Sequence, residues 1–359
     1  MKLIKFRFTT PLHIGTVRAD TDTSESTVHS DTLYSSIIMA WSRLGIEHPM
    51  MRNRQVEDPI HDIGFTLTSM FPYYQKVDKQ GDSIGEPLLF FPRPIGTIKP
   101  DGYKMHKQFK AIKHIDLQHF KHLLQTGNID VEKLDTNIHG DYLTANIDIK
   151  EMIKRKEDFM ERSVSPRVYV PRMGEKDSQG NLIDDTEIFY MERIYFRGKS
   201  GFFCLIDFEN DEIENKVKAA LNYLQDEGIG SDRNTGNGMF EYDIEPFDGL
   251  DDIIKMKTDY RTSMSLFCPE KAETLYDMIG NDETSKATYE LVKRGGWMTT
   301  TPHLNFRKNS IYMMNVGSIL KTTALTAGKT VDLRPDALSS GHSVYRVGKS
   351  LFLPINIQT

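Results

Sequence analysis

The first pattern along the chain is an alternation of apolar and charged side chains. Ile4, Phe6 and Phe8 are separated by single charged residues, and a period of two is typical of a half-buried strand. We therefore expect the chain to open with a β-strand, which the segment TTPLHIG at residues 9–15 ends.

The second pattern has helical spacing and follows a polar loop. Ser30 or Asp31 can cap a helix at this point, and Gly45 is placed to end it. One face of this helix is apolar, which predicts that it packs on a core. That face consists of Leu33, Ile37, Ala40, Trp41 and Leu44.

Two strand-like runs and a second helix lie further along the chain. The segment 189–209 has an apolar run on each side of RGKSG, which predicts a hairpin. Residues 211–227 follow with acidic residues in the first turn, as in a helix. The apolar face of this helix consists of Ile213, Val217, Leu221 and Leu224. A glycine-rich loop at 228–238 and the strand-like run MFEYDIE come last.

Strand, helix, hairpin, helix and strand is the order of a ferredoxin-like unit. We therefore predict an α+β fold whose first domain covers residues 1–247 and carries a large insertion at about 46–187. A second domain is expected over 248–359. Its patterns predict a strand in 260–269, a helix in 269–280, and a pair of strands in YELVKRGGWMTT and NSIYMMNVGSIL.

Charge is spread unevenly along the chain. The net charge is -6 overall, but residues 291–359 hold nine lysines and arginines against two acidic residues. Smaller basic stretches occur at 104–114 and 150–172. Local basic patches can bind phosphate even in an acidic protein, although a chain with 45 basic residues also forms such clusters by chance.

The sequence lacks the marks of an exported or membrane protein. Its first ten residues have no apolar core, and no window reaches the ~18 apolar residues of a membrane span. Cys204 and Cys268 lie far apart without a CxxC pair, so neither a disulfide framework nor a cysteine zinc site is expected. These features predict a cytoplasmic protein without a membrane partner.

The segment GIGSDRNTGNGMF at 228–240 is the strongest candidate site. A nucleotide cofactor site needs the order strand, glycine loop, helix, whereas this loop follows a helix that Gly228 can cap and precedes a strand that Gly238 opens. No cofactor is therefore expected. A structural turn and a surface for a sugar-phosphate chain both remain open. The donors available to such a chain are Ser231, Arg233, Asn234, Thr235 and Asn237.

The loop and several other motifs resemble a known family. A helix followed by GIGSDRNTGNGMFE is similar to the glycine-rich signature of the RAMP superfamily of CRISPR RNA-binding proteins. The motifs HSDTLYSSI, LLFFPRP, YELVKRGGWM, MMNVGSIL and GHSVYRVGKSLFLPI narrow the likeness. Over nearly the whole length, the chain resembles subunit four of the type III-A CRISPR effector (Csm) complex.

This resemblance implies two ferredoxin-like (RRM-like) domains and a non-catalytic crRNA-binding and assembly subunit. Such a subunit holds the five-prime tag of the crRNA and contacts the large polymerase-like subunit and the backbone RAMP subunit. The loop residues assigned to crRNA contact are Gly230, Ser231, Arg233, Asn234, Gly236 and Gly238. Further contacts are assigned to His13, Arg18 and His29, and to Arg167 and Arg172 on a hairpin expected to reach between neighbouring subunits.

A catalytic alternative has to be weighed, because some RAMP relatives cleave RNA with histidine as acid or base. His13 and His29 flank the first loop and would take these roles in a metal-independent endoribonuclease. Because the chain has eleven histidines, ordinary hydrogen-bonding or base-stacking roles are favoured over catalysis for His13 and His29.

No metal site is expected. The loop acids Asp20, Asp22, Glu25 and Asp31 are interpreted as a solvated face. The three histidines His114, His119 and His122 lack a carboxylate or cysteine at suitable spacing and are interpreted as surface residues.

Aromatic side chains beside basic residues are candidate platforms for RNA bases, because stacking contributes about 1–3 kcal/mol per base. The candidates are Tyr169, Phe196, Trp297 and Phe306.

Overall fold

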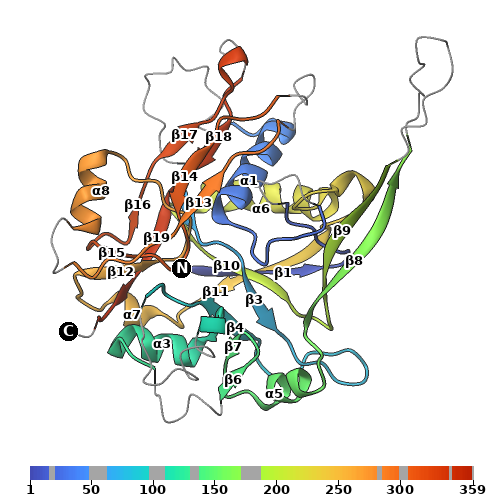
Figure 1. The fold of residues 1–359 in the computed structure, drawn as a ribbon, viewed down its shortest axis with the longest axis horizontal. Coiled ribbons are helices and arrows are strands. Elements are labelled where there is room, and N and C mark those ends of the chain that lie inside the picture. Colours follow the sequence, from blue (N-terminus) through green and yellow to red (C-terminus); the bar gives the residue numbers. More distant parts are fainter. Residues whose placement is uncertain are drawn as a thin grey trace.

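The computed structural model describes residues 1–15, 21–47, 63–96, 110–129, 137–170, 187–280, 285–298, 306–338 and 342–357. In these ranges the chain has a mixed α+β fold built around one large sheet (Figure 1). None of the described helices is long and apolar enough to cross a membrane. Arg18 and Arg172 fall outside the described residues, as does Asp20.

The large sheet runs in the order β11-β1-β10-β3-β4-β5-β7-β6, with β2 also paired to β10. All its pairings are antiparallel except that of β5 with β7. Its strands are β1 (Lys2–Phe8), β2 (Phe65–Leu67), β3 (Phe71–Tyr74), β4 (Leu88–Pro92), β5 (His114–Asp116), β6 (Ile138–His139), β7 (Tyr142–Leu143), β10 (Gly201–Phe208) and β11 (Phe240–Pro246). The opening strand predicted from the alternation is confirmed as β1.

Two long helices cover one face of this sheet. Helix α1 (Ser30–Leu44) packs against α6 (Asp211–Glu227), and the indole of Trp41 donates to the carbonyl of Lys216 at 2.7 Å. Both predicted apolar faces are buried, apart from the half-buried Ile213 and the exposed Leu44. Gly45 ends α1 in the left-handed conformation, as expected.

The opposite face of the sheet packs on other elements. Leu3, Phe203 and Leu205 point into a second core cluster, which also holds Phe120 and Leu353. These last two come from α3 (Leu117–Thr126) and from β19 (Ser350–Ile355) of the C-terminal part. The main sheet is therefore buried on both faces around β10, and α3 and β19 share this second core cluster with it. A further helix, α5 (Ile147–Lys154), packs beside β6.

The hairpin predicted over 189–209 is wrong. Strand β9 (Glu187–Phe196) pairs along its whole length with β8 (Met160–Tyr169), while β10 enters the main sheet between β1 and β3. The reason is burial: β10 is apolar on both sides and belongs in the core, whereas most of β9 is exposed or half-buried. Together β8 and β9 form a two-stranded ribbon that projects from the body (Figure 1).

Strands β2 and β3 correct the extent of the predicted insertion. They lie within residues 46–187, yet both pair with β10 in the main sheet. This part of the range therefore belongs to the main sheet. There β2 and β3 pair with β10 at the position where the predicted hairpin would have placed β9.

The C-terminal part has its own four-stranded sheet, in the order β15-β12-β19-β16. Two further pairs, β13 with β14 and β17 with β18, lie beside it. The predicted strand pair is confirmed as β13 and β14, and the predicted helix as α8. These elements are α7 (Asp251–Ile254), β12 (Tyr260–Ser263), α8 (Ala272–Ile279), β13 (Leu291–Arg294), β14 (Ile311–Met314), β15 (Ile319–Lys321), β16 (Thr326–Ala327), β17 (Thr330–Asp332) and β18 (Tyr345–Val347).

A buried ion cluster joins the start of α1 to the C-terminal part. Asp31 is 0% exposed and accepts two hydrogen bonds from Arg294, at 2.8 and 3.0 Å, and one from Arg346 at 2.9 Å. The interpretation of Asp31 as a solvated acid is therefore wrong, because two guanidinium groups compensate its burial. The predicted cap is also shifted: His29 occupies the N-cap position, and Ser30 begins the helix.

Candidate nucleic-acid interface

The glycine-rich loop is held against the segment that follows β1. The N–H of Gly238 donates to the carbonyl of Pro11 at 2.8 Å, and the N–H of Ser231 donates to the carbonyl of His13 at 2.9 Å. Within the loop, Ile229 donates to the carbonyl of Gly238 at 2.9 Å. The first two bonds attach the loop to residues 11–13, and the third joins its two ends between α6 and β11.

The four glycines serve different purposes. A side chain at Gly228, Gly230 or Gly238 would collide with backbone carbonyls of the protein itself, and all three residues have positive φ. Gly236 also has a positive φ of 85°, but nothing lies within 4 Å of the place its Cβ would occupy. Close packing of the chain on itself thus accounts for three glycines, and Gly236 alone of the four has open space beside it.

Gly228 refines the cap prediction. Its N–H donates to the carbonyl of Leu224 at 2.8 Å and ends α6. Its φ of 80° is positive as expected, but its ψ of 163° leaves the left-handed helical region and turns the chain into the loop.

Asp232 organises the loop and brings a distant arginine to it. Its carboxylate accepts from the amide of Asn237 at 2.8 Å and from Arg167 of β8 at 3.0 Å. Arg193 of β9 lies 3.6 Å from the same carboxylate, and Arg167 also donates to the hydroxyl of Thr235 at 3.3 Å. The projecting ribbon and the loop therefore meet in one cationic surface.

Polar groups of this surface remain open to solvent. Ser231, Asn234 and Thr235 are exposed, and Arg233 is partly exposed. In the part of the chain that the structure describes, Arg233 has no ion-pair partner. Asn237, by contrast, is buried and serves the loop itself. Arg167 and Arg193 share the carboxylate of Asp232, and Arg233 is the next residue in the loop. The surface therefore has an excess of positive charge suited to phosphate groups.

Sequence reasoning missed Arg193. It lies on β9 opposite Ser163 of β8, inside a segment predicted to pair with β10. Since its approach to Asp232 depends on the β8–β9 pairing, only the correct strand partner could have indicated its place.

The two candidate catalytic histidines have separate environments. His13 is 2% exposed, and its Nδ1 lies 2.7 Å from the carbonyl oxygen of Glu192. His29 is half-buried, and its Nε2 lies 3.3 Å from the carboxylate of Glu25. His13 therefore supports the loop through its backbone carbonyl, and its ring is not presented to solvent.

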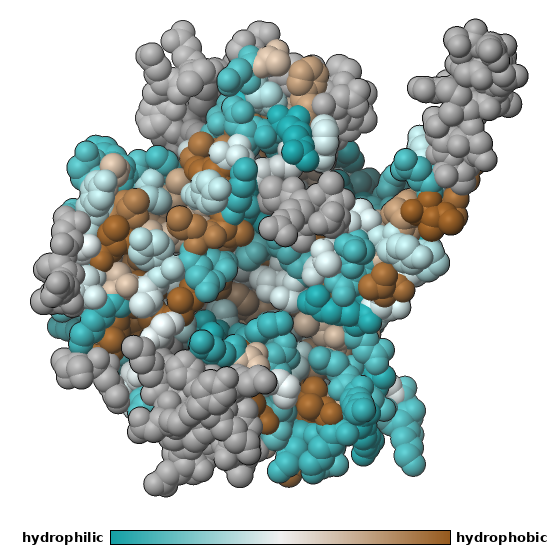
Figure 2. All heavy atoms as spheres, viewed as in Figure 1, coloured by the Kyte–Doolittle hydropathy of each residue, from teal (hydrophilic) through white to brown (hydrophobic). Residues whose placement is uncertain are grey.

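The four aromatic candidates divide into two groups. Phe196 stacks on Phe8 with ring centroids 5.6 Å apart and packs against the core, so its interpretation as a platform is wrong. Tyr169, Trp297 and Phe306 are exposed. Tyr169 belongs to the projecting ribbon, where hydrophobic residues gather on the surface (Figure 2).

The histidines near α3 also need one correction. His114 is buried rather than on the surface, where it stacks on Tyr142 and where burial lowers its pKa to about 4. His119 lies 2.8 Å from the carboxylate of Asp116 and 3.0 Å from the amide of Asn137. Among the described residues, no three histidine, cysteine or acidic side chains are grouped to hold a metal ion.

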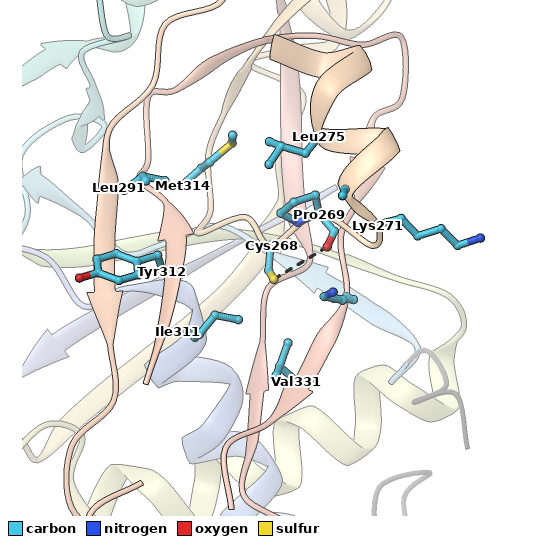
Figure 3. Close-up of a pocket in the computed structure, with 11 residues that line it drawn as sticks. Cys268, Pro269, Lys271, Leu275, Leu291, Ile311, Tyr312, Met314 and Val331 are labelled. Atoms are coloured by element: carbon cyan, nitrogen blue, oxygen red, sulfur yellow. Dashed lines mark hydrogen bonds between the residues drawn. The ribbon is translucent and has the colours of Figure 1, made fainter. Parts of the chain in front are cut away.

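An apolar hollow of about 360 Å³ lies elsewhere, between α8 and the strands β13 and β14 (Figure 3). Leu275, Leu291 and Met314 line it together with Cys268, whose pKa is raised by burial. Its lining holds no acid and base pair and little polar surface, so it differs in kind from the cationic surface at the loop.

The chain has a mixed α+β fold, with a glycine-rich loop between a helix and the edge strand of a large sheet. Residues 256–355 match the family model described as the CRISPR Csm4 C-terminal domain. This match and the relatives below support the likeness to the Csm4 subunit of type III CRISPR complexes that the motifs indicated.

Relatives extend the match along the whole chain. A CRISPR system Cms protein Csm4 of Methanocaldococcus jannaschii is 24% identical over 99% of this chain and 97% of its own length. The protein of the same name from Streptococcus thermophilus is 22% identical, covering 94% of this chain and 93% of its own. In a solved Csm3–Csm4 subcomplex of a type III-A interference complex, one chain is 20% identical with a TM-score of 0.64. It covers 99% of this chain and 100% of its own.

Proposed function

We propose that this chain is the non-catalytic crRNA-binding and assembly subunit of a type III-A CRISPR complex, and that it holds the five-prime tag of the crRNA. The observation that carries the proposal is the cationic surface at the glycine-rich loop. There Arg167 and Arg193 converge on Asp232, while Arg233 stays unpaired among the described residues. An RNA backbone is the ligand that such a surface fits, because phosphates bind arginine strongly and lie at regular intervals.

Within this proposal, the first unit is ferredoxin-like. Taking β2 and β3 as one broken strand, the order β11-β1-β10-β3 places the fourth strand beside the first and the third beside the second. Both helices that connect these strands pack together. We assign residues 1–247 to this unit and 248–359 to a second one of related design, in which β12 lies between β15 and β19.

The partners follow from the family. Solved structures of Csm4 relatives include a Csm3–Csm4 subcomplex and a Csm1–Csm4 cassette in complex with cA4. We propose that this chain likewise contacts a large polymerase-like subunit and a backbone RAMP subunit. The exposed β8–β9 ribbon, with Tyr169 and Tyr190 among its surface residues, is the element best placed to reach a neighbour.

The endoribonuclease alternative has less support. An acid and base pair must both reach the scissile phosphate and its 2′-hydroxyl group. His13 is buried against the carbonyl of Glu192, and His29 is engaged with Glu25. We therefore propose binding without cleavage, with His13 and His29 acting as structural supports of the site.

Co-expression tests the proposal. When the chain is purified together with large and backbone subunits of a type III-A system, we expect crRNA and both subunits to co-purify with it. We also expect no cleavage when repeat RNA is incubated with the chain alone. Recovery of a chain without either subunit or RNA would contradict the assembly role, and cleavage that disappears in His13→Ala or His29→Ala would favour the enzyme.

A further inference from the structure

An exposed tryptophan stands at the end of the β13–β14 hairpin. Beyond the two strands the hairpin continues through a bridge between Trp297 and Arg307. Hydrogen bonds from Lys308 to the carbonyl of Gly296 and from Met298 to the carbonyl of Phe306, both 2.9 Å long, support it. The side chain of Trp297 is nevertheless 52% exposed. A large indole held on a fixed backbone and left open to water is an unusual surface feature.

Arg307 lies over this indole. Its guanidinium carbon is 4.9 Å from the ring centroid, a cation–π distance. Arg307 has no carboxylate partner among the described residues. The pair therefore presents a flat ring and an uncompensated positive charge side by side.

Lys308 adds a second cation at the base of the hairpin. Its ammonium group has no hydrogen-bond or ion-pair partner in the described part of the chain. Burial and the nearby Arg346 lower the pKa of Lys308 to about 8, and Asp31 opposes this only in part. Since Asp31 is already bonded to Arg294 and Arg346, the base of the hairpin carries more positive than negative charge.

A series of contacts links this hairpin to the glycine-rich loop. Arg294 lies 3.6 Å from the carboxylate of Glu25. Ser24, which precedes Glu25, donates its N–H to the carboxylate of Glu192 at 2.6 Å. The carbonyl of Glu192 contacts the ring of His13, whose own carbonyl accepts from Ser231 of the loop. These contacts therefore connect the glycine-rich loop, strand β9 of the ribbon and the β13–β14 hairpin.

We propose that Trp297 and Arg307 form a second RNA subsite, where one base of a single-stranded RNA stacks on the indole while Arg307 neutralises an adjoining phosphate. This inference rests on the proposed function, because the RNA is the same strand that the glycine-rich loop holds. Stacking on an aromatic ring is tolerant of base identity, so the subsite would position the strand without reading its sequence.

The chemistry of the hairpin favours RNA over a protein partner. Its exposed ring lies beside the guanidinium group of Arg307, which lacks a carboxylate partner among the described residues. A basic surface with an aromatic platform is the usual arrangement for single-stranded nucleic acid. The experiment below distinguishes RNA binding from a protein contact at the same place.

Tryptophan fluorescence provides a direct test. The chain has two tryptophans, and Trp41 is fully buried, so quenching by an added ligand reports on Trp297. We expect a single-stranded RNA of about ten nucleotides to quench the emission of the full chain. Trp297→Ala should weaken binding of this RNA about tenfold, whereas Trp297→Phe should retain most of the affinity. Tyr276→Ala removes another exposed aromatic, on α8, and should change nothing.

The outcomes separate this subsite from the proposed function. If RNA binding is weakened by Arg233→Ala but not by Trp297→Ala, and emission does not change, the subsite is wrong and the proposed function stands. If the wild-type chain and its complex bind no RNA, both are wrong. If Trp297→Ala loosens a subunit contact while RNA affinity is unchanged, the hairpin is a protein interface and the inference is overturned.

Discussion

Replacing Asp31 by alanine is expected to lower the free energy of unfolding by about 3–5 kcal/mol. Asp31 is fully buried, and three hydrogen bonds connect it to Arg294 and Arg346. Removal of the carboxylate leaves two buried guanidinium groups with only the carboxylate of Glu25, 3.6 Å from Arg294, as a neighbouring anion. This costs far more than the loss of one surface ion pair. Urea unfolding followed by circular dichroism measures the change.

Asp22 supplies the matched control. It lies in the same segment as Asp31 but is exposed. We expect Asp22→Ala to change the unfolding free energy by less than about 0.5 kcal/mol. Equal stability of the two variants would contradict the assigned role of the buried cluster.

The same carboxylate predicts a pH dependence. Burial opposes its charged form, but the nearby guanidinium groups of Arg294 and Arg346 outweigh burial and hold the pKa of Asp31 well below its usual range. A group with a lowered pKa stabilises the folded state above its unfolded pKa of about 3.9. The stability difference between wild type and Asp31→Ala should therefore be constant near neutral pH and shrink as the pH falls below about 4.

The largest functional effect is expected from the double substitution Arg167→Ala with Arg233→Ala. Both arginines lie at the glycine-rich loop, one bound to Asp232 at 3.0 Å and the other unpaired among the described residues. Each is placed to meet a phosphate, so we expect crRNA affinity to fall about 100-fold. The slope of log affinity against log salt should also become shallower by about 1–2 units.

Arg197→Ala is the matched control for this pair. Arg197 is also an exposed arginine, but it follows β9 at the other end of the β8–β9 ribbon from Arg167. Ion pairs with Glu157 and Glu161 neutralise it there. Its removal should leave affinity and salt dependence unchanged. An unchanged salt slope in the double variant would show that the loop does not bind phosphate.

The periodicity of the sequence correctly predicts the elements that are buried mainly on one side. Strand β1 and helices α1 and α6 have one apolar and one polar side, so their periodicity is clear and their positions agree with the structure. The elements that sequence reasoning misplaced are buried on both sides or on neither. Strand β10 is apolar on both faces, and on the side away from β1 its partners are the short strands β2 and β3, in a stretch without clear periodicity.

Long-range charge pairing limits site prediction in the same way. Asp31 lies 263 residues from Arg294 and 315 from Arg346, so nothing in the local sequence distinguishes it from the exposed Asp22. The glycine-rich loop could be located from its composition. The packing roles of Gly230 and Gly238, in contrast to the open space beside Gly236, depend on His13 and Ile229 and become visible only in the folded chain.

The central claim is that the glycine-rich loop contacts the five-prime tag of the crRNA. Photocrosslinking of an assembled type III-A complex, with a thio-substituted base at each tag position in turn, tests it most directly. Mass spectrometry of the crosslinked peptides should find residues 228–240 of this chain joined to the tag. Crosslinks that fall only on other subunits, or on this chain only at α3 and α8, would contradict the claim.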